Sequence, residues 1–164
     1  MRITCQRKPP IRATLFLSLL FVFVLGSKTY AATEAKLLPS DGAAYDYFGY
    51  VASISSDAAL IGADSNDDNG VDSGSAYVFR RNGSNWVQEQ KLLPSDGAAY
   101  DYFGTSVSIS GNVALVGADR NGDNGEESGS AYVFRWNGSS WVEEQKLLAS
   151  DGAAGDRFGQ EISI

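Results

Sequence analysis

The feature that most limits how this chain can fold is an internal repeat of 55 residues. The fourteen residues KLLPSDGAAYDYFG begin at Lys36 and occur again, unchanged, at Lys91. Residues 36–90 align with residues 91–145 without a gap, and a shorter third copy, residues 146–164, begins with KLLASDGAAGDRFG. A fixed period of this length means that one structural unit is formed repeatedly and that each unit packs on its neighbours.

Each repeat has the pattern of four short β-strands joined by turns. The candidate segments are rich in β-branched, aromatic and small residues, none has a helical period, and Asn82–Gly83 suits a tight hairpin turn. The expected strands of the first repeat are residues 50–55, 58–62, 75–80 and 85–93. Four antiparallel strands at a fixed period are typical of a β-propeller blade. We therefore expect an all-β fold of β-propeller-type four-stranded antiparallel blades, with about two and a third blades present in an open, incomplete array.

The most strictly repeated stretch is expected to join one blade to the next. QKLL ends an outermost strand, SDGAA forms the connection, and YDYFG leads into the innermost strand of the following blade. We expect Phe48 and Phe103 to be buried between neighbouring blades. Gly49 and Gly104 would allow a sharp turn or a close backbone approach there, because glycine has no side chain to collide.

These motifs resemble the FG-GAP repeat. Phe-Gly is followed thirteen residues later by Gly-Ala-Asp and then by SGSAYVF, in the same order in both complete repeats. Asp64 and Asp119 stand where the motif that gives the family its name has proline. The resemblance covers residues 36–164 and implies a propeller like that of integrin alpha chains. It also implies a role in binding or cell adhesion that often depends on calcium and is rarely catalytic, so we do not expect the chain to be an enzyme.

Residues 1–32 have the pattern of a secretory signal peptide. A basic start is followed by an apolar run over residues 15–25, and small residues at Thr29 and Ala31 suit a cleavage site. A membrane anchor is the alternative interpretation, but the apolar run is far shorter than the roughly 20 residues that span a bilayer. We therefore expect a secreted, extracellular protein whose FG-GAP β-propeller segment is residues 33–164.

The composition excludes several functions. The chain has no histidine, and its only cysteine, Cys5, lies in the expected signal peptide. Nucleophilic catalysis by Ser-His-Asp or Cys-His groups and zinc sites built on imidazole are therefore excluded. Five of the 13 basic residues also lie in the signal peptide, which leaves 8 basic and 20 acidic residues, a net charge of −12. We expect no nucleic-acid partner, because phosphates require a basic surface, and we expect partners that are cations or basic surfaces.

The segment between the second and third expected strands of each repeat is the candidate metal site. Oxygen-bearing side chains fall at alternate positions, with a glycine carbonyl between them, and this is how a tight turn wraps oxygen atoms around Ca²⁺. The candidate calcium ligands are Asp64, Asn66, Asp68, Gly70 and Asp72 in the first repeat and Asp119, Asn121, Asp123, Gly125 and Glu127 in the second. A solvated acidic turn held by side-chain hydrogen bonds is the alternative that the sequence leaves open. The calcium loop of the family precedes Gly-Ala-Pro, so its metal residues cannot be transferred here by position.

Up-and-down strands place the acidic segments and the connections between blades on one face of the array. The hairpin turns, with Arg80, Arg81 and Arg135 beside them, are expected on the opposite face. The resemblance to integrins implies that a protein or carbohydrate ligand docks on the loop-rich face. We expect a secreted binding, adhesion or structural module that is stabilised by calcium and has no catalytic activity of its own. The alternative is the non-catalytic propeller part of a secreted polysaccharide-degrading or other hydrolytic enzyme.

Overall fold

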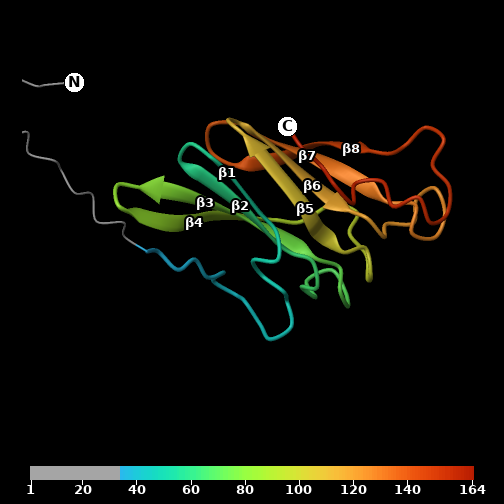
Figure 1. Cartoon of the computed structure of the whole chain (residues 1–164), viewed down its shortest axis with the longest axis horizontal. Helices are drawn as coiled ribbons and strands as arrows, with labels where there is room; N and C mark the ends of the chain where they lie inside the picture. Colours follow the sequence, from blue (N-terminus) through green and yellow to red (C-terminus); the bar gives the residue numbers. More distant parts are fainter. Residues whose placement is uncertain (1–33) are drawn as a thin grey trace, which may run out of the picture. The chain divides into compact units, whose positions relative to one another are not determined.

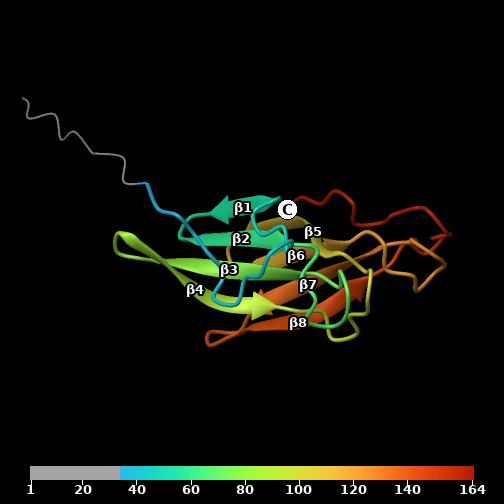
Figure 2. The same cartoon turned by 90° about the horizontal axis from the view of Figure 1, so that it is seen from below.

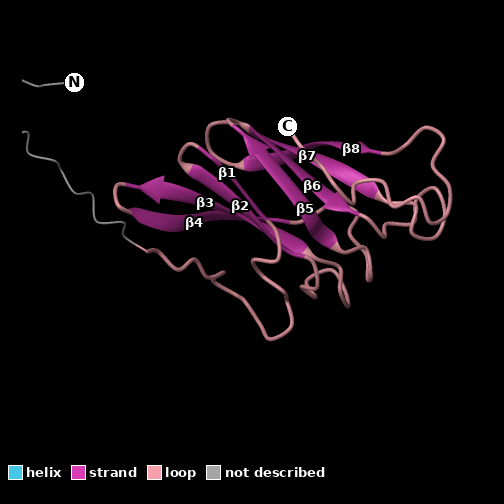
Figure 3. Ribbon diagram, viewed as in Figure 1, coloured by secondary structure: helices cyan, strands magenta, loops and turns pink. Residues whose placement is uncertain are grey.

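The computed structural model describes residues 34–164, and the predicted signal peptide lies outside the described residues. The described part of the chain consists of strands, turns and loops, and it contains no helix that is long and apolar enough to cross a membrane. Figure 3 shows this distribution of strands and loops. The prediction of an all-β fold is confirmed.

Eight strands form two four-stranded antiparallel sheets, one from each complete repeat (Figure 1). In both sheets the strands lie side by side in chain order. The first sheet contains β1 (Ala52–Ser55), β2 (Ala58–Ala63), β3 (Ser75–Asn82) and β4 (Asn85–Leu92). The second sheet contains β5 (Phe103–Ser110), β6 (Val113–Ala118), β7 (Ser130–Trp136) and β8 (Trp141–Leu147). This order is that of successive propeller blades, as predicted.

The strand positions agree closely with the sequence pattern, and the main difference is at the innermost strands. β1 begins at Ala52, whereas the pattern predicted a strand from Tyr50. Tyr50 instead closes a turn, because its N–H donates a hydrogen bond to the Tyr47 carbonyl oxygen at 3.1 Å. The equivalent strand β5 starts earlier, at Phe103, and contains a bulge before Ser106. The other strands of the first repeat begin at the predicted residues.

The two sheets lie against each other (Figure 2), and Phe103 belongs to the buried cluster to which both contribute. Phe103 has no exposed surface and makes edge-to-face contacts with Tyr132 and Phe134 of its own sheet, with ring centroids 5.3 and 6.0 Å apart. The first sheet contributes Ala58, Leu60, Ala76, Val78 and Leu92 to the same buried cluster. Phe103 therefore lies between neighbouring blades, as the repeat pattern predicted.

Phe48 occupies the equivalent position on the outer face of the first sheet. Its ring centroid lies 5.4 Å from that of Tyr77 and 6.0 Å from that of Phe79, nearly the same geometry as around Phe103. Phe48 is nevertheless only half-buried, because no further sheet of the described residues covers this face. The prediction that Phe48 is buried between blades was therefore wrong.

The backbones of successive repeats approach each other at glycine residues. A Cβ atom added to Gly74, whose φ is +84°, would collide with the carbonyl oxygen of Phe103, and one added to Gly62 would collide with that of Gly104. A side chain at Gly104 would in turn collide with the carbonyl oxygen of Ser75. The close approach predicted at Gly104 is confirmed, whereas the space around the equivalent glycine of the first repeat is open.

Serine hydroxyl groups connect the innermost segments of successive repeats. The N–H of Ile109 in β5 donates a hydrogen bond to Ser53 Oγ in β1 at 3.2 Å. One repeat later, the N–H of Ile164 donates to Ser108 Oγ at 3.1 Å. Ile164, at the end of the third repeat, is therefore held beside β5 in the way that Ile109 is held beside β1.

Candidate functional site

Two acidic segments of each repeat come together at one end of the sheets. We call residues 64–72 and 119–127 the acidic loops and residues 40–47 and 95–102 the blade links. Both kinds of segment lie at the end opposite the hairpin turns in Figure 1. The prediction that they share a face is confirmed by the side-chain contacts between them.

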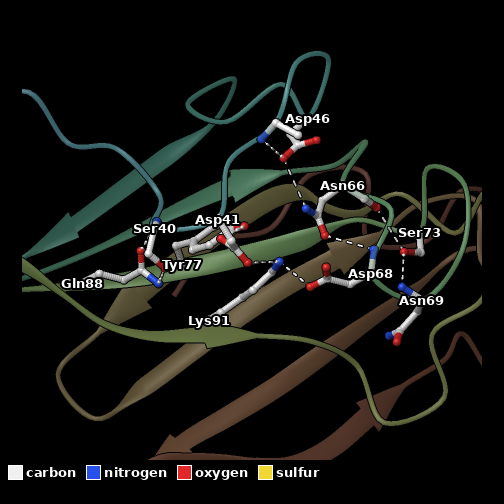
Figure 4. Close-up of polar contacts among 11 residues, drawn as sticks. Ser40, Asp41, Asp46, Asn66, Asp68, Asn69, Ser73, Tyr77, Gln88 and Lys91 are labelled. Carbon is white, nitrogen blue, oxygen red and sulfur yellow. Dashed lines mark hydrogen bonds and ion pairs between the residues drawn. The ribbon is translucent and has the colours of Figure 1, made fainter.

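A buried asparagine connects each acidic loop to a blade link. Asn66 Nδ2 donates a hydrogen bond to Asp46 Oδ2 at 3.3 Å, and each residue is only 6% exposed (Figure 4). Asn66 Oδ1 accepts a hydrogen bond from the Asp68 N–H at 3.2 Å, so the same side chain also shapes the loop. Asn121 and Asp101 repeat the first contact at 3.2 Å. Both loops are therefore held against their links by buried polar contacts.

A lysine ammonium group lies between the two acidic segments of the first repeat. Lys91 Nζ is 2.8 Å from Asp41 Oδ2 in the blade link and is also paired with Asp68 Oδ2 in the acidic loop (Figure 4). It lies 5.2 Å from the centroid of the Tyr77 ring, and the Tyr77 hydroxyl donates to Asp41 Oδ1 at 3.0 Å. The Lys91 side chain is only 15% exposed, so these contacts are partly shielded from water.

The second repeat reproduces this arrangement. Lys146 Nζ lies 2.7 Å from Asp96 Oδ2 and 2.6 Å from Asp123 Oδ2, and 5.2 Å from the centroid of the Tyr132 ring. The Tyr132 hydroxyl donates to Asp96 Oδ1 at 2.8 Å. We call each set a lysine cluster: Lys91, Asp41, Asp68 and Tyr77 in the first repeat, and Lys146, Asp96, Asp123 and Tyr132 in the second.

The ion pairs shift the pKa values of the clustered groups. The hydrogen bond from Lys91 lowers the pKa of Asp41 below its usual value. Burial by itself would lower the pKa of Lys91, but its hydrogen bonds to Asp41 and Asp68 raise that pKa overall. In the second repeat burial by itself would raise the pKa of Asp96, but the hydrogen bonds from Lys146 and Tyr132 and the charge of Lys146 together lower it overall. These shifts favour the charged form of the lysines and of their partners in the blade links at neutral pH.

The ten predicted calcium ligands lie in the two acidic loops, five in each repeat. No group of three or more acidic side chains in residues 34–164 lies close enough to hold a metal ion. At the fifth loop position, Asp68 and Asp123 are paired with lysines instead. The carbonyl oxygens of Gly70 and Gly125 accept the N–H of the serine three residues later, at 3.1 and 3.0 Å.

The last loop position reaches the following repeat. Asp72 Oδ2 accepts a hydrogen bond from the Tyr102 hydroxyl at 3.4 Å, and Glu127 Oε2 pairs with Arg157 Nη2 at 2.6 Å. At the first position, Asp64 Oδ1 is buried without a hydrogen-bond partner in the described part of the chain. Burial raises the pKa of Asp64, and the nearby carboxylates raise it further.

Eight of the ten predicted ligands therefore have a hydrogen-bond or ion-pair partner in residues 34–164, and the two at the first loop position are the exceptions. A calcium shell needs six to eight oxygen atoms that can turn toward one ion, and the residues present do not fit it. Calcium binding itself stays a prediction, and the arrangement of these side chains argues against it.

Sequence analysis missed the roles of the two lysines and of their partners in the blade links. Lys91 and Lys146 each open a copy of the repeated KLL motif, and this repetition was the only signal available. Their partners Asp41 and Asp96 lie 50 residues earlier in the chain, too far for a local pattern to predict.

Two of the three arginines expected at the hairpin end form ion pairs, whereas within residues 34–164 the Arg81 side chain donates only to the Gly83 carbonyl oxygen, at 3.2 Å. Arg80 pairs with Asp57 and with Glu89, at 3.1 and 3.0 Å, and Arg135 pairs with Glu144 at 2.8 Å. Acidic neighbours in the described part of the chain therefore neutralise Arg80 and Arg135 on the expected basic face, but not Arg81.

Successive four-stranded blades joined through glycine contacts define a propeller-type repeat module. A family model described as the FG-GAP repeat matches residues 32–79, 86–134 and 141–164, which together form most of the chain. The chain therefore belongs to the FG-GAP repeat family, whose repeats are generally non-enzymatic modules. A comparison with curated proteins found no match.

Proposed function

We propose that this chain is a secreted, non-catalytic binding module whose loop-rich face recognises a basic protein surface. The observation that carries the proposal is a set of exposed carboxylates on that face without a basic partner among residues 34–164. These residues are Asp67, Glu126 and Asp151. Unpaired carboxylates attract positively charged partners and accelerate their association.

Exposed tyrosines on the same loops support a role in binding a protein. Tyr45, Tyr47 and Tyr100 in the blade links are 84%, 60% and 57% exposed. Tyrosine is enriched at protein interfaces because its ring supplies contact area and its hydroxyl group a hydrogen bond. Tyr100 also lines a pocket of about 470 Å³, together with Glu126 of the acidic loop.

The loop face is also held in place before any partner binds. The buried Asn66–Asp46 contact and the lysine cluster fix the first acidic loop against its blade link. A surface that is already ordered loses less conformational entropy on binding. The same contacts in the second repeat would give a row of similar acidic loops.

Binding can be tested with a fluorescent lysine-rich peptide as the probe. The variant Asp67→Asn/Glu126→Gln removes two carboxylates from the loop face, and Asp57→Asn/Glu144→Gln removes two at the hairpin end. Fluorescence anisotropy at low salt should show that the first variant weakens peptide binding several-fold and the second much less. Equal loss in both variants would indicate non-specific attraction to the net charge and contradict the proposal. A preference for a neutral oligosaccharide over the peptide would also contradict it.

Secretion is a separate part of the proposal, and it rests on the pattern of residues 1–32. Expression of the full chain with a C-terminal tag should yield an extracellular product from which that segment has been removed. Intact mass spectrometry would identify the new N-terminus, which we expect near residue 32. Retention of the full-length chain inside the cell would contradict this part.

A further inference from the structure

Each lysine cluster resembles a cation-binding site in which the cation is the ammonium group of the lysine. The ammonium group of Lys91 contacts one carboxylate of the blade link and one of the acidic loop. It also lies over the ring of Tyr77, and aromatic faces attract cations. The second repeat presents the same three contacts to Lys146.

We propose that Lys91 and Lys146 act as the built-in cations of the acidic loops, so that these blades hold loop and link together without calcium. This inference concerns the stability of the loop face and does not depend on which partner that face binds.

The sheet register places the ammonium group at this point. Tyr77 in β3 and Lys91 in β4 are directly opposite each other, and Tyr132 and Lys146 are opposite each other in the second sheet. Side chains of directly opposite residues lie on the same face of a sheet. The lysine therefore lies along the tyrosine ring and reaches the acidic segments beyond the strand ends, which leaves little freedom for any other arrangement.

Charge balance explains why a cation is needed here. The fold brings Asp41 of the link and Asp68 of the loop to the same ammonium group, and without it two carboxylates would face each other. The Lys91 side chain is 15% exposed, so salt in the solvent screens this repulsion less than it would at an open surface. Removing one partner of a shielded ion pair is costly because it leaves the other charge uncompensated.

Most of the other predicted calcium ligands already have protein partners, and Asp64 Oδ1 is the predicted ligand atom that is buried without one among the described residues. Asn66 holds the blade link, the Gly70 carbonyl closes a turn, and Asp72 accepts from the next repeat. A calcium ion would have to displace several of these contacts and an ammonium group at once. We therefore expect calcium to have no measurable effect on the folded protein.

The first experiment measures thermal melting of the unaltered protein in millimolar calcium and in chelator. A ligand that binds only the folded state raises the melting temperature by mass action. We expect the two melting temperatures to agree within about 1 °C. A ligand that stabilises the folded state by about 1 kcal/mol would raise the melting temperature by several degrees, so the difference would be measurable. We also expect no binding heat in a calcium titration by calorimetry. A clear rise with calcium, or saturable binding heat, would overturn the proposal.

The second experiment removes the ammonium groups. Lys91→Met/Lys146→Met keeps the long apolar part of each side chain and deletes the charge, so it should lower the melting temperature by several degrees. Lys36→Met is the matched control, because Lys36 begins the same motif but is exposed and forms no ion pair within residues 34–164. Its melting temperature should not change.

An equal effect of the double variant and the control would overturn the proposal. If the double variant does not fold, the two single variants and the calcium measurements on the unaltered protein still decide it.

Discussion

The packing between the two sheets can be measured by truncating one phenylalanine in each repeat. Phe103 is fully buried and Phe48 is half-buried, although both make the same two edge-to-face contacts within their own sheets. The variants Phe103→Ala and Phe48→Ala therefore lose similar contacts within a sheet. The difference between them reports the contact with the neighbouring sheet alone.

The expected magnitude follows from burial. Truncating a fully buried phenylalanine to alanine costs about 3–5 kcal/mol of unfolding free energy. The two aromatic pairs account for about 1–3 kcal/mol, and both variants lose them. Because Phe48 is covered on one side only, we expect Phe103→Ala to be less stable than Phe48→Ala by about 2 kcal/mol. For a unit of this size that corresponds to roughly 8 °C in melting temperature.

Urea unfolding provides the assay. Trp141 is 3% exposed and belongs to the buried cluster between the sheets, so its fluorescence should follow loss of that packing. The free energies are obtained by linear extrapolation, with the slopes compared to confirm that the same surface is exposed in both variants. If Phe48→Ala proves as destabilising as Phe103→Ala, the two sheets gain nothing from each other and the reasoning is refuted.

Three further predictions test individual positions. Gly74→Ala should lower the unfolding free energy measured in urea by about 2 kcal/mol or more, because Gly74 has a φ of +84° and its added Cβ would collide with the Phe103 carbonyl group. Gly83→Ala, where the added Cβ meets open space, should cost only about 1 kcal/mol of backbone strain. Asp64→Asn should raise the melting temperature at pH 7. Burial raises the pKa of Asp64, so the folded state loses stability as pH rises from about 4 through that pKa. The rise in melting temperature that Asp64→Asn produces should therefore vanish below about pH 4. A rise that persists there would contradict this account. The stabilisation that Lys91 provides, measured as the difference in melting temperature between the unaltered protein and Lys91→Met, should decline only above about pH 10. Burial lowers the pKa of Lys91, but its carboxylate partners raise it overall, so its stabilising contribution is complete below its unfolded pKa and is lost above it; a decline that begins near pH 8 would contradict the prediction.

The fold could be predicted from the sequence because its evidence is local and repeated. The period of 55 residues, the strand patterns and the Phe-Gly and Gly-Ala-Asp motifs are each contained in a short stretch. Strands β2, β3 and β4 begin at the predicted residues for this reason. A copied segment also predicts a copied contact, and the second repeat does reproduce the lysine cluster of the first.

The burial of equivalent residues could not be predicted in this way. Phe48 and Phe103 lie in identical sequence, yet only Phe103 is covered by a second sheet. Burial depends on what packs against a residue from elsewhere in the chain. The sequence of the motif itself contains no information about that neighbour.

The acidic loops show the same division more sharply. Their alternating oxygen atoms, from Asp64 to Asp72, are a property of the sequence alone and indicate an affinity for cations. Only the tertiary structure brings Lys91 to Asp68, and the two residues lie in different segments joined through the sheet register. The sequence by itself determined that each repeat forms a blade with an acidic loop. The packing of strands and links decided that an ammonium group of the chain pairs with one carboxylate of that loop, because ion pairs depend on distance in space and not on spacing in the sequence.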